Sequence, residues 1–335
     1  MSTMIIFVFY KFMKIIYSSN PSPHFNIAAE EYLFNTSDEY FFVYINSPSV
    51  IVGKHQNAFA EVNTDFCEAN NIPVIRRMSG GGAVYHDEGN INFCFIRNME
   101  EGEKERFTTL TRPVMECLRK QGLSPEYSRR SDLLINGKKF SGNAEHMRKN
   151  RVLHHGTILF SADITNLSSA LKKEDAAFSG YAVKSVRSEV INLSGLLPGK
   201  SVYDIIHMLI ETVKEDYPEA TDYTFSPEDE TAVSALAEMK YNCRDWNYGY
   251  SPGFTLCRSV QLVNTTVSSE VRVERGSIVS VKFSGIPREQ DAAALLMKLA
   301  GIRYRKKEVA EVLKGQEWQW FKELLPEQEM MKLIF

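Results

Sequence analysis

Three consecutive glycines stand between two strand-like runs, and this arrangement constrains the fold more than any other feature of the chain. The run Arg76-Arg77-Met78-Ser79-Gly80-Gly81-Gly82 leads directly into Ala83-Val84-Tyr85-His86. Residues 83–85 alternate as in a β-strand, whereas the dinucleotide fingerprint Gly-x-Gly-x-x-Gly must open a helix. The sequence therefore does not predict a dinucleotide-binding fold.

The glycine run is nevertheless suited to hold an anion. A backbone without side-chain bulk can bring several N–H donors to one point, and Arg77 adds a forked cation. A flexible hairpin tip is the plain alternative. Because Arg77, Ser79 and His86 lie beside the glycines, we favour a binding loop. A second phosphate-loop candidate, Ser194–Ser201, lacks the first glycine and contains Pro198, which has no N–H, so we do not favour it.

The order of the predicted elements indicates an α+β fold. Ser22-Pro23 is typical of a helix start, a second helix is expected over 108–121 before Gly122, and a third begins after Ser201. Strand and helix do not alternate strictly, so a mixed or largely antiparallel sheet is expected rather than a doubly wound parallel one. The predicted strands are 40–45, 49–53, 73–75, 83–85 paired with 91–96, 152–160 and 186–193.

Length and texture predict two domains. The 335 residues exceed an ordinary single domain, and the amino-acid composition changes near residues 245–252. Beyond it we expect strands at 259–264, 270–274 and 278–283 and helices at 290–299 and 306–313. We assign 13–246 to a first domain, in which we look for the site, and 252–335 to a small accessory α+β C-terminal domain, and we interpret 1–12 as a start-site extension.

Charge and cysteine usage exclude several classes of protein. The 39 basic and 42 acidic residues give a net charge of −3, which argues against a general nucleic-acid surface. The five scattered cysteines contain no Cys-x-x-Cys pair, so we expect neither a zinc site nor a disulfide framework. The apolar run 4–10 is followed by Lys11 and Lys14, too early for a membrane span. We therefore expect a cytoplasmic protein that binds neither membranes nor nucleic acid.

Two further segments carry candidate chemistry. Residues 131–144 are predicted to form a hairpin around Asn136-Gly137. Lys138 and Lys139 then point to opposite faces, so one of them can enter a groove and neutralise a phosphate or acyl oxygen. Asp132 could hold Mg²⁺ together with phosphates. The alternative is that Asp132, Lys138 and Lys139 are ordinary surface groups on a solvent-exposed turn.

Adjacent histidines open the strand that follows this hairpin. His154 and His155 must face opposite sides of a strand, which excludes a His-x-His metal pair. One buried structural histidine and one site residue are equally compatible with this pattern.

Taken together, these motifs resemble the lipoate–protein ligase family. The pattern Arg-Arg-x-Ser-Gly-Gly-Gly-Ala-Val-Tyr-His-Asp-x-Gly-Asn spans 76–90, Lys-x-Ser-Gly-Asn-Ala spans 139–144, and His-His-Gly-Thr spans 154–157. The segments 26–31, 53–57, 184–188 and 246–249 are similar to further family motifs. The likeness covers nearly the whole chain after Met13.

The resemblance implies a catalytic domain like that of biotin ligases and class II aminoacyl-tRNA synthetases. It also implies a two-step reaction in which lipoate and ATP form lipoyl-AMP and a lysine of an acceptor then displaces AMP. The implied acceptors are lipoyl domains of 2-oxoacid dehydrogenase E2 subunits and the glycine cleavage H protein. The implied cofactors are ATP and Mg²⁺, with lipoate as the substrate.

The resemblance also assigns roles to individual residues. Lys139 is the implied catalytic cation, touching both the acyl oxygen and the phosphate, and Asp132 is the implied Mg²⁺ ligand. The implied ATP and adenylate contacts are Arg77, Gly82, Ala83, Val84, Tyr85, Lys139 and Lys184. The implied lipoate contacts are Ser79, His86, Asn90, Lys139 and His155. The loop 178–187 is expected to close over the adenylate, and Glu189 departs from the arginine that several relatives carry at this position.

Two other functions remain open from the sequence. A cysteine-dependent octanoyl or lipoyl transferase of the same fold would need an activated thiol, and no motif above contains a cysteine. A non-catalytic acyl or nucleotide carrier would not need Lys139. The intact motifs favour the ligase.

Overall fold

The largest element of the fold is an eight-stranded mixed sheet. The computed structural model describes residues 12–99, 106–172, 177–263, 265–286, 293–319, 322 and 325–335. The strand order is β12 (Thr221–Asp222), β1 (Met13–Ser18), β2 (Glu39–Ile45), β6 (Asn90–Asn98), β10 (Arg151–Leu159), β9 (Lys138–Arg148), β8 (Asp132–Ile135) and β7 (Glu126–Tyr127). Strand β1 pairs in parallel with β12 and β2, and the other pairs are antiparallel. The predicted α+β fold with a mixed sheet is confirmed.

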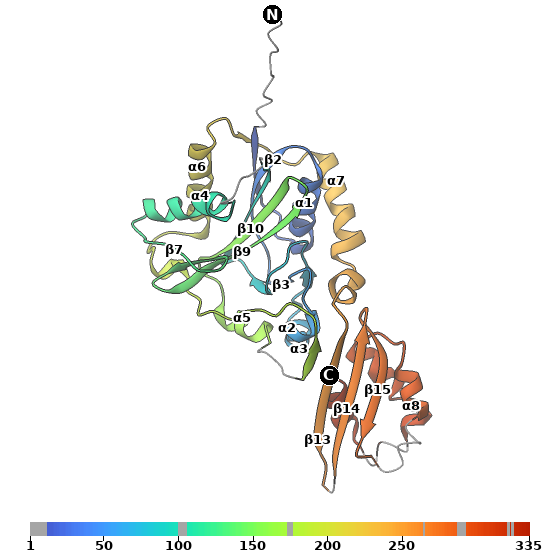
Figure 1. Cartoon of the computed structure of the whole chain (residues 1–335). Coiled ribbons are helices and arrows are strands. Elements are labelled where there is room, and N and C mark those ends of the chain that lie inside the picture. The colour runs from blue at the N-terminus through green and yellow to red at the C-terminus, as the bar shows by residue number, and fades with distance from the viewer. Residues whose placement is uncertain are drawn as a thin grey trace, which may run out of the picture.

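Helices cover both faces of this sheet. In β2, Phe41 and Val43 pack in one core with α4 (Arg106–Lys120) and α6 (Val202–Asp216), because alternate residues of a strand face the same side. Tyr40, Phe42 and Tyr44 pack on the opposite side with α1 (Pro23–Asn35) and α7 (Pro227–Leu236). Figure 1 shows these two helix pairs on either side of the sheet.

The predicted helix starts and ends are confirmed. The Ser22 hydroxyl accepts from the Phe25 N–H at 3.3 Å, with Pro23 at the first helical position. Ser201 and Asp204 form a reciprocal capping box at the start of α6. Helix α4 ends just before Gly122, whose φ is +81°.

A separate three-stranded sheet carries the glycine loop. Its order is β4 (Val74–Arg76), β3 (Ser49–Val52) and β5 (Val84–His86). The predicted pairing of 83–85 with 91–96 is wrong, because β5 pairs with β3 whereas β6 lies between β2 and β10. The intervening turn binds the end of β10 instead: the Gly89 C=O accepts from the N–H groups of Phe160 (3.0 Å) and Ser161 (2.9 Å). The chain thus crosses from one sheet to another at this turn.

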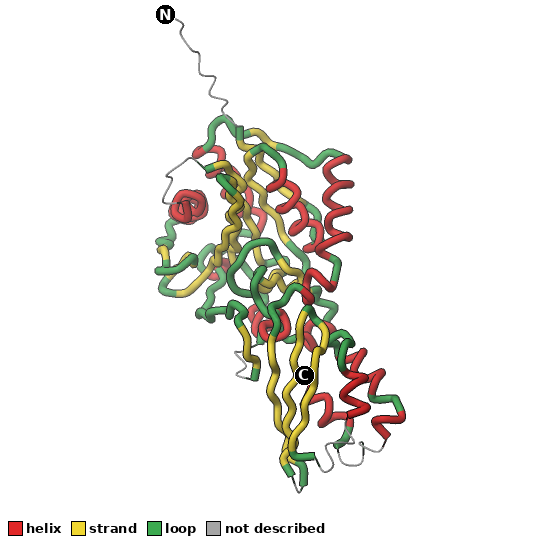
Figure 2. Tube along the Cα trace, turned by 45° about the vertical axis from the view of Figure 1, so that its right-hand side comes forward, coloured by secondary structure: helices red, strands yellow, loops and turns green. Residues whose placement is uncertain are grey.

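The third sheet is antiparallel and combines two distant parts of the chain. It contains β11 (Phe178–Gly180), β13 (Phe254–Gln261), β14 (Thr266–Glu274) and β15 (Ser277–Ser284). Figures 1 and 2 show the long strands of this sheet beside the C-terminal helices, below the larger sheet. These helices are α8 (Ala293–Leu299), α9 (Lys306–Val312), α10 (Gln316–Gln319) and α11 (Glu327–Ile334). Part of the predicted helix 290–299 lies outside the described residues, and the proposed domain limits stay a prediction.

The remaining helices are short. They are α2 (Ala58–Glu61), α3 (Thr64–Ala69), α5 (Ile164–Ala170), the 3₁₀ turn η1 (Leu193–Gly195) and the π turns η2 (Ala237–Tyr241) and η3 (Asp245–Gly249). Across the described ranges, no helix has both the length and the apolar character needed to cross a bilayer. Residues 1–11 of the proposed start-site extension lie outside those ranges.

The predicted strand over 186–193 is wrong. This segment is irregular and forms a single bridge, between Val190 and Lys139. The Lys139 N–H donates to the Glu189 C=O and its C=O accepts from the Ile191 N–H, both at 2.9 Å. A single pairing residue makes a bridge but not a strand. Val186 is 61% exposed, although a strand of apolar residues would be expected to be buried.

Candidate active site

Two adjoining cavities gather the residues that the sequence singled out. The first, here called the glycine-loop cavity, has a volume of 320 Å³, and the second, here called the Tyr85 cavity, has 200 Å³. The glycine-loop cavity is lined by Arg77, Gly82, Ala83, Val84, His86, Asp132, Lys139, His155 and Lys184, among others. The Tyr85 cavity shares Ala83, Val84 and Lys139 and adds Tyr85 and Asn90. Of the predicted site residues, Ser79 alone lies behind these walls, where it is 1% exposed.

Lys139 of β9 stands at the junction of the two cavities. Its ammonium lies 2.7 Å from Asp132 Oδ1 across the hairpin. The predicted Asn-Gly turn brings the two together, with φ of 52° at Asn136 and 74° at Gly137. Lys138 points away and pairs with Glu189 at 2.6 Å, so the expected opposite orientation of the two lysines is confirmed. The site thus contains one cation whose counterion is itself a potential metal ligand.

The glycine loop is held in shape by Arg77. This guanidinium is buried and donates to Ser79 Oγ (2.9 Å) and to the carbonyls of Ile51 (3.2 Å), Gly80 (2.5 Å) and Gly82 (2.9 Å). Burial lowers the pKa of Arg77 to about 10, so it stays charged at neutral pH. Its donors therefore fix the backbone of the loop, and its predicted contact with ATP stays a prediction.

Ser79 and His155 continue this network. Because Arg77 Nε donates to Ser79 Oγ, the Ser79 hydroxyl is free to donate to His155 Nε2 at 2.6 Å. His155 Nδ1 then carries the proton and donates to Glu30 Oε2 at 2.7 Å. Tyr44 donates to the other oxygen of Glu30 at 3.0 Å. The imidazole of His155 is thus fixed in one tautomer at the wall of the cavity.

His86 presents a buried N–H to the same cavity. Asn26 Nδ2 donates to Asn46 Oδ1 at 2.9 Å, so Asn46 donates its own amide to His86 Nδ1 at 3.0 Å. Burial, reinforced by the charge of Arg77, lowers the pKa of His86 to about 3, so the ring is neutral and Nε2 carries its proton. Within the described residues this Nε2 has no partner, and the same holds for Asn90 Oδ1. Both atoms are suited to bind polar groups of a ligand.

The loop that was expected to close over the site contacts the glycine loop directly. Ser185 Oγ accepts from the Ala83 N–H and from Gln56 Nε2, both at 3.0 Å. The Ser185 N–H donates to Glu61 at 3.1 Å, and Lys184 lines the glycine-loop cavity. A few residues earlier, β11 pairs with β13 of the C-terminal sheet. The loop is therefore held both by the site and by that sheet.

The sequence argument missed several residues that shape the site. Arg76 is fully buried and donates to the carbonyls of Gly53 (2.9 Å) and Gln56 (2.8 Å), to Asn247 O (2.8 Å) and to Ser251 Oγ (2.9 Å). It thereby ties the glycine-loop sheet to the η3 turn. The Arg-Arg motif was the sequence signal that could have identified Arg76 in advance. Glu30, Gln56 and Ser185 lie in segments that the resemblance named, but their partners are distant in sequence.

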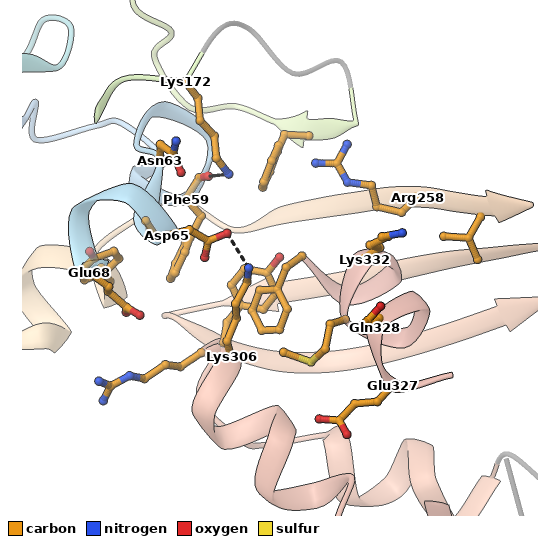
Figure 3. Close-up of a pocket in the computed structure, with 18 of the residues that line it drawn as sticks. Phe59, Asn63, Asp65, Glu68, Lys172, Arg258, Lys306, Glu327, Gln328 and Lys332 are labelled. Atoms are coloured by element: carbon orange, nitrogen blue, oxygen red, sulfur yellow. Dashed lines mark hydrogen bonds and ion pairs between the residues drawn. The ribbon is translucent and has the colours of Figure 1, made fainter. Parts of the chain in front are cut away.

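A larger cavity lies away from the predicted site residues. It has a volume of 1170 Å³ and opens between α3 and the C-terminal sheet and helices, as Figure 3 shows. Lys306 and Asp65 pair across it at 2.6 Å. No predicted site residue lines it. Because the glycine loop, Lys139 and His155 converge elsewhere, we assign the chemistry to the smaller cavities.

No cysteine lines either site cavity. Cys67, Cys94 and Cys117 are buried, and burial raises the pKa of Cys67 to about 12 and of Cys117 to about 11. Burial likewise raises the pKa of Cys94 well above its usual range. These thiols are protonated and inaccessible, which does not suit a cysteine-dependent transferase.

Known proteins resemble this chain in sequence. The family described as lipoyl protein ligase A/B catalytic domain matches residues 22–214. The lipoate–protein ligase LplJ of Bacillus subtilis is 34% identical over 320 residues, which cover 93% of this chain and 97% of that protein.

Two solved structures have a similar fold. One is a bipartite lipoate–protein ligase studied with its E2 lipoyl domain from Thermoplasma acidophilum, with a TM-score of 0.61 and 26% identity over 71% of this chain and 96% of that one. The other is lipoate–protein ligase A bound with ATP, with a TM-score of 0.60 and 26% identity over 71% and 98% of the two chains.

Proposed function

The chain belongs to the lipoate–protein ligase family, and from this premise we propose how its site carries out ATP-dependent lipoylation. The protein activates lipoate with ATP and transfers the lipoyl group to a lysine of an acceptor protein. The observation that carries the assignment is that Lys139 and two glycines of the loop, Gly81 and Gly82, line the same cavity.

The first step must bring two anions together. A carboxylate oxygen of lipoate attacks the α-phosphorus of ATP, the bond from that phosphorus to the bridging oxygen breaks, and pyrophosphate leaves. Charge neutralisation and alignment are the main needs of such a reaction. Lys139 supplies the cation between the two reacting groups, and the N–H groups of the glycine loop face the phosphate.

The two cavities are suited to the two substrates. The Tyr85 cavity contains the aliphatic side chains Leu159, Ile164 and Leu167, which can cover a nucleobase. The glycine-loop cavity extends to Ile27, Tyr44 and Ile51, which provide apolar walls for an acyl chain. The neutral His86 Nε2–H and the oriented His155 are two of its polar groups. Arg77 and Ser79 act by holding the loop and His155 in place.

Asp132 is the residue that would hold Mg²⁺. In the described part of the chain, no group of three or more metal-ligating side chains converges. This fits Mg²⁺, which commonly takes one or two protein carboxylates and completes its shell with phosphates and water. When bound, the ion would add positive charge beside the phosphates, while Lys139 and Asp132 keep each other in position.

In the second step, the ε-amine of the acceptor lysine attacks the acyl carbon of lipoyl-AMP. The bond from that carbon to the phosphate oxygen breaks, AMP leaves and the amine loses a proton. We propose lipoyl domains of 2-oxoacid dehydrogenase E2 subunits as the acceptors, together with the glycine cleavage H protein. The related archaeal ligase studied with its E2 lipoyl domain supports the first of these.

The test measures both steps with the wild-type protein. Pyrophosphate release should require both ATP and lipoate, and a lipoyl domain should then gain the mass of one lipoyl group. Lipoyl transfer from an acylated donor protein in the absence of ATP would instead identify a transferase. Tight binding of lipoate without either product would identify a carrier.

A further inference from the structure

Arg130 lies where the glycine-loop cavity meets a third, more open cavity. This outer cavity has a volume of 530 Å³ and is lined by Gly80, Gly81, Phe107, Arg130, Ser131, Asn143, Ala144, Glu145 and His154. Arg130 lines both cavities and is exposed. A guanidinium at this junction can reach a ligand that extends from one cavity into the other.

The segment that carries Arg130 is firmly held. Ser128 Oγ accepts from the Arg130 N–H at 3.0 Å and from the Asp132 N–H at 3.2 Å. Asn143 donates both its backbone N–H (3.1 Å) and its side-chain amide (3.0 Å) to the Ser131 C=O. Arg130 is thus anchored two residues from Asp132, on the loop that leads into the hairpin carrying Lys139.

Two other cations of the site, Arg77 and Lys139, are already engaged. Arg77 directs its donors into the glycine loop, and Lys139 pairs with Asp132. Within the described residues, no hydrogen bond or ion pair occupies the guanidinium of Arg130, so its fork is available to a ligand. The carboxylate of the outer cavity, Glu145, lies 3.0 Å from His154 Nδ1.

We propose that Arg130 binds the β- and γ-phosphates of ATP and the departing pyrophosphate, with the outer cavity receiving them. The inference rests on the proposed function, which places the α-phosphate at Lys139. Lys139 joins the Tyr85 cavity to the glycine-loop cavity, and Arg130 joins the latter to the outer cavity. A triphosphate that extends from Lys139 into the outer cavity along Gly81 and Ser131, which line both cavities, comes within reach of Arg130. As the bond to the α-phosphorus breaks, negative charge grows on the leaving pyrophosphate, and a guanidinium pairs with two of its oxygens at once.

The experiment compares Arg130→Ala with Arg129→Ala. Arg129 is a neighbour that is also exposed and that lines neither the glycine-loop nor the outer cavity, so it controls for general charge. Adenylation is followed as pyrophosphate release, and transfer is followed separately from synthetic lipoyl-AMP to a lipoyl domain. Thermal unfolding of both variants checks that they are folded.

The expected result is a loss confined to the first step. Arg130→Ala should lower kcat/KM for ATP about 10²-fold, and Arg130→Lys should recover part of it. Transfer from lipoyl-AMP should stay within about twofold of wild type, because pyrophosphate takes no part in it. Arg129→Ala should resemble wild type in both steps.

Two results would overturn the inference. The first is that Arg130→Ala and Arg129→Ala change kcat/KM for ATP by the same factor. The other is an equal loss in transfer from lipoyl-AMP, which would place Arg130 at the acceptor. Absence of ATP-dependent pyrophosphate release in the wild-type protein would instead refute the proposed function itself.

Discussion

At the scale of single residues, Gly142 leaves the space that Lys139 occupies. A Cβ at this position would lie 2.9 Å from both Cε and Nζ of Lys139 and 3.9 Å from Asp132 Oδ1. The end of a lysine is flexible, so the added methyl group would displace the ammonium rather than the backbone. Gly142 has no reactive side chain, yet the space that it leaves determines where the ammonium of Lys139 lies.

We expect Gly142→Ala to impair adenylation while leaving the fold intact. A displacement of about 1 Å at the reacting centre can cost about 10²-fold, and we expect a loss of that size in kcat/KM for pyrophosphate release. The free energy of unfolding should change by less than about 1 kcal/mol. The control is Gly195→Ala, where a Cβ meets nothing within 4 Å. Wild-type kinetics in Gly142→Ala would contradict this account.

From the sequence, the positions of site residues could be predicted only where they depend on neighbours in the same strand or turn. Alternation along a strand predicted correctly that Lys138 and Lys139, and likewise His154 and His155, diverge. It could not predict that Glu30 orients His155, because 125 positions separate them. Such a partner depends on how α1 packs on the sheet, which is a property of the whole fold.

At the scale of elements, the hairpin of β8 and β9 supports the chemistry. Its turn requires two residues in the left-handed region, Asn136 and Gly137. Asparagine tolerates this region better than most residues and glycine adopts it freely, so the turn sets the pairing of Ile135 with Lys138. A shift of register between Leu133 and Leu134 then pairs Asp132 with Gly142, and from there the Asp132 carboxylate contacts Lys139. A Cβ at Gly137 would meet nothing within 4 Å. The left-handed backbone conformation, and not a lack of space, therefore restricts substitution at this position.

Replacing Gly137 with alanine should lower stability without affecting the chemistry directly. The left-handed conformation costs an alanine roughly 1–2 kcal/mol, and urea unfolding should show a loss of that size. Adenylation measured well below the melting temperature should stay within about twofold of wild type. Gly195→Ala again serves as the control. Unchanged stability in Gly137→Ala would show that this turn is not strained by a side chain.

Elements whose pairing depends on distant partners were predicted less well. The hairpin around Asn136-Gly137 was predicted because its signal is local. Strand β5 was assigned to the wrong partner because the turn before β6 binds the end of β10, which is some seventy residues away. The expected strand at 186–193 has apolar residues, yet Lys139 provides only one pairing position for it.

At the scale of the whole molecule, Phe59 joins the two parts of the chain. It lies on α2, at the wall of the larger cavity, and is 6% exposed. Its ring centroid is 5.2 Å from that of Tyr248, 5.7 Å from that of Phe254 and 4.9 Å from that of Tyr304. Together with strand β11, it inserts an element of the first part into the core of the C-terminal part.

Phe59→Ala should therefore destabilise the protein strongly. Truncation of a buried phenylalanine typically costs about 3–5 kcal/mol, and we expect a corresponding fall in the melting temperature. Tyr203→Ala removes an aromatic ring that is 62% exposed and should change the free energy of unfolding by less than about 0.5 kcal/mol. Equal melting temperatures for the two variants would show that the two parts do not depend on this contact.

The central claim is that one ammonium group, Lys139, allows two anions to react. Its most direct test is pyrophosphate release from ATP and lipoate by Lys139→Ala, with Lys138→Ala as the control on the opposite face of the same strand. We predict that Lys139→Ala lowers the rate by about 10³-fold while its melting temperature stays close to that of the control, which itself reacts at the wild-type rate. Release of pyrophosphate by folded Lys139→Ala at the wild-type rate would contradict the account.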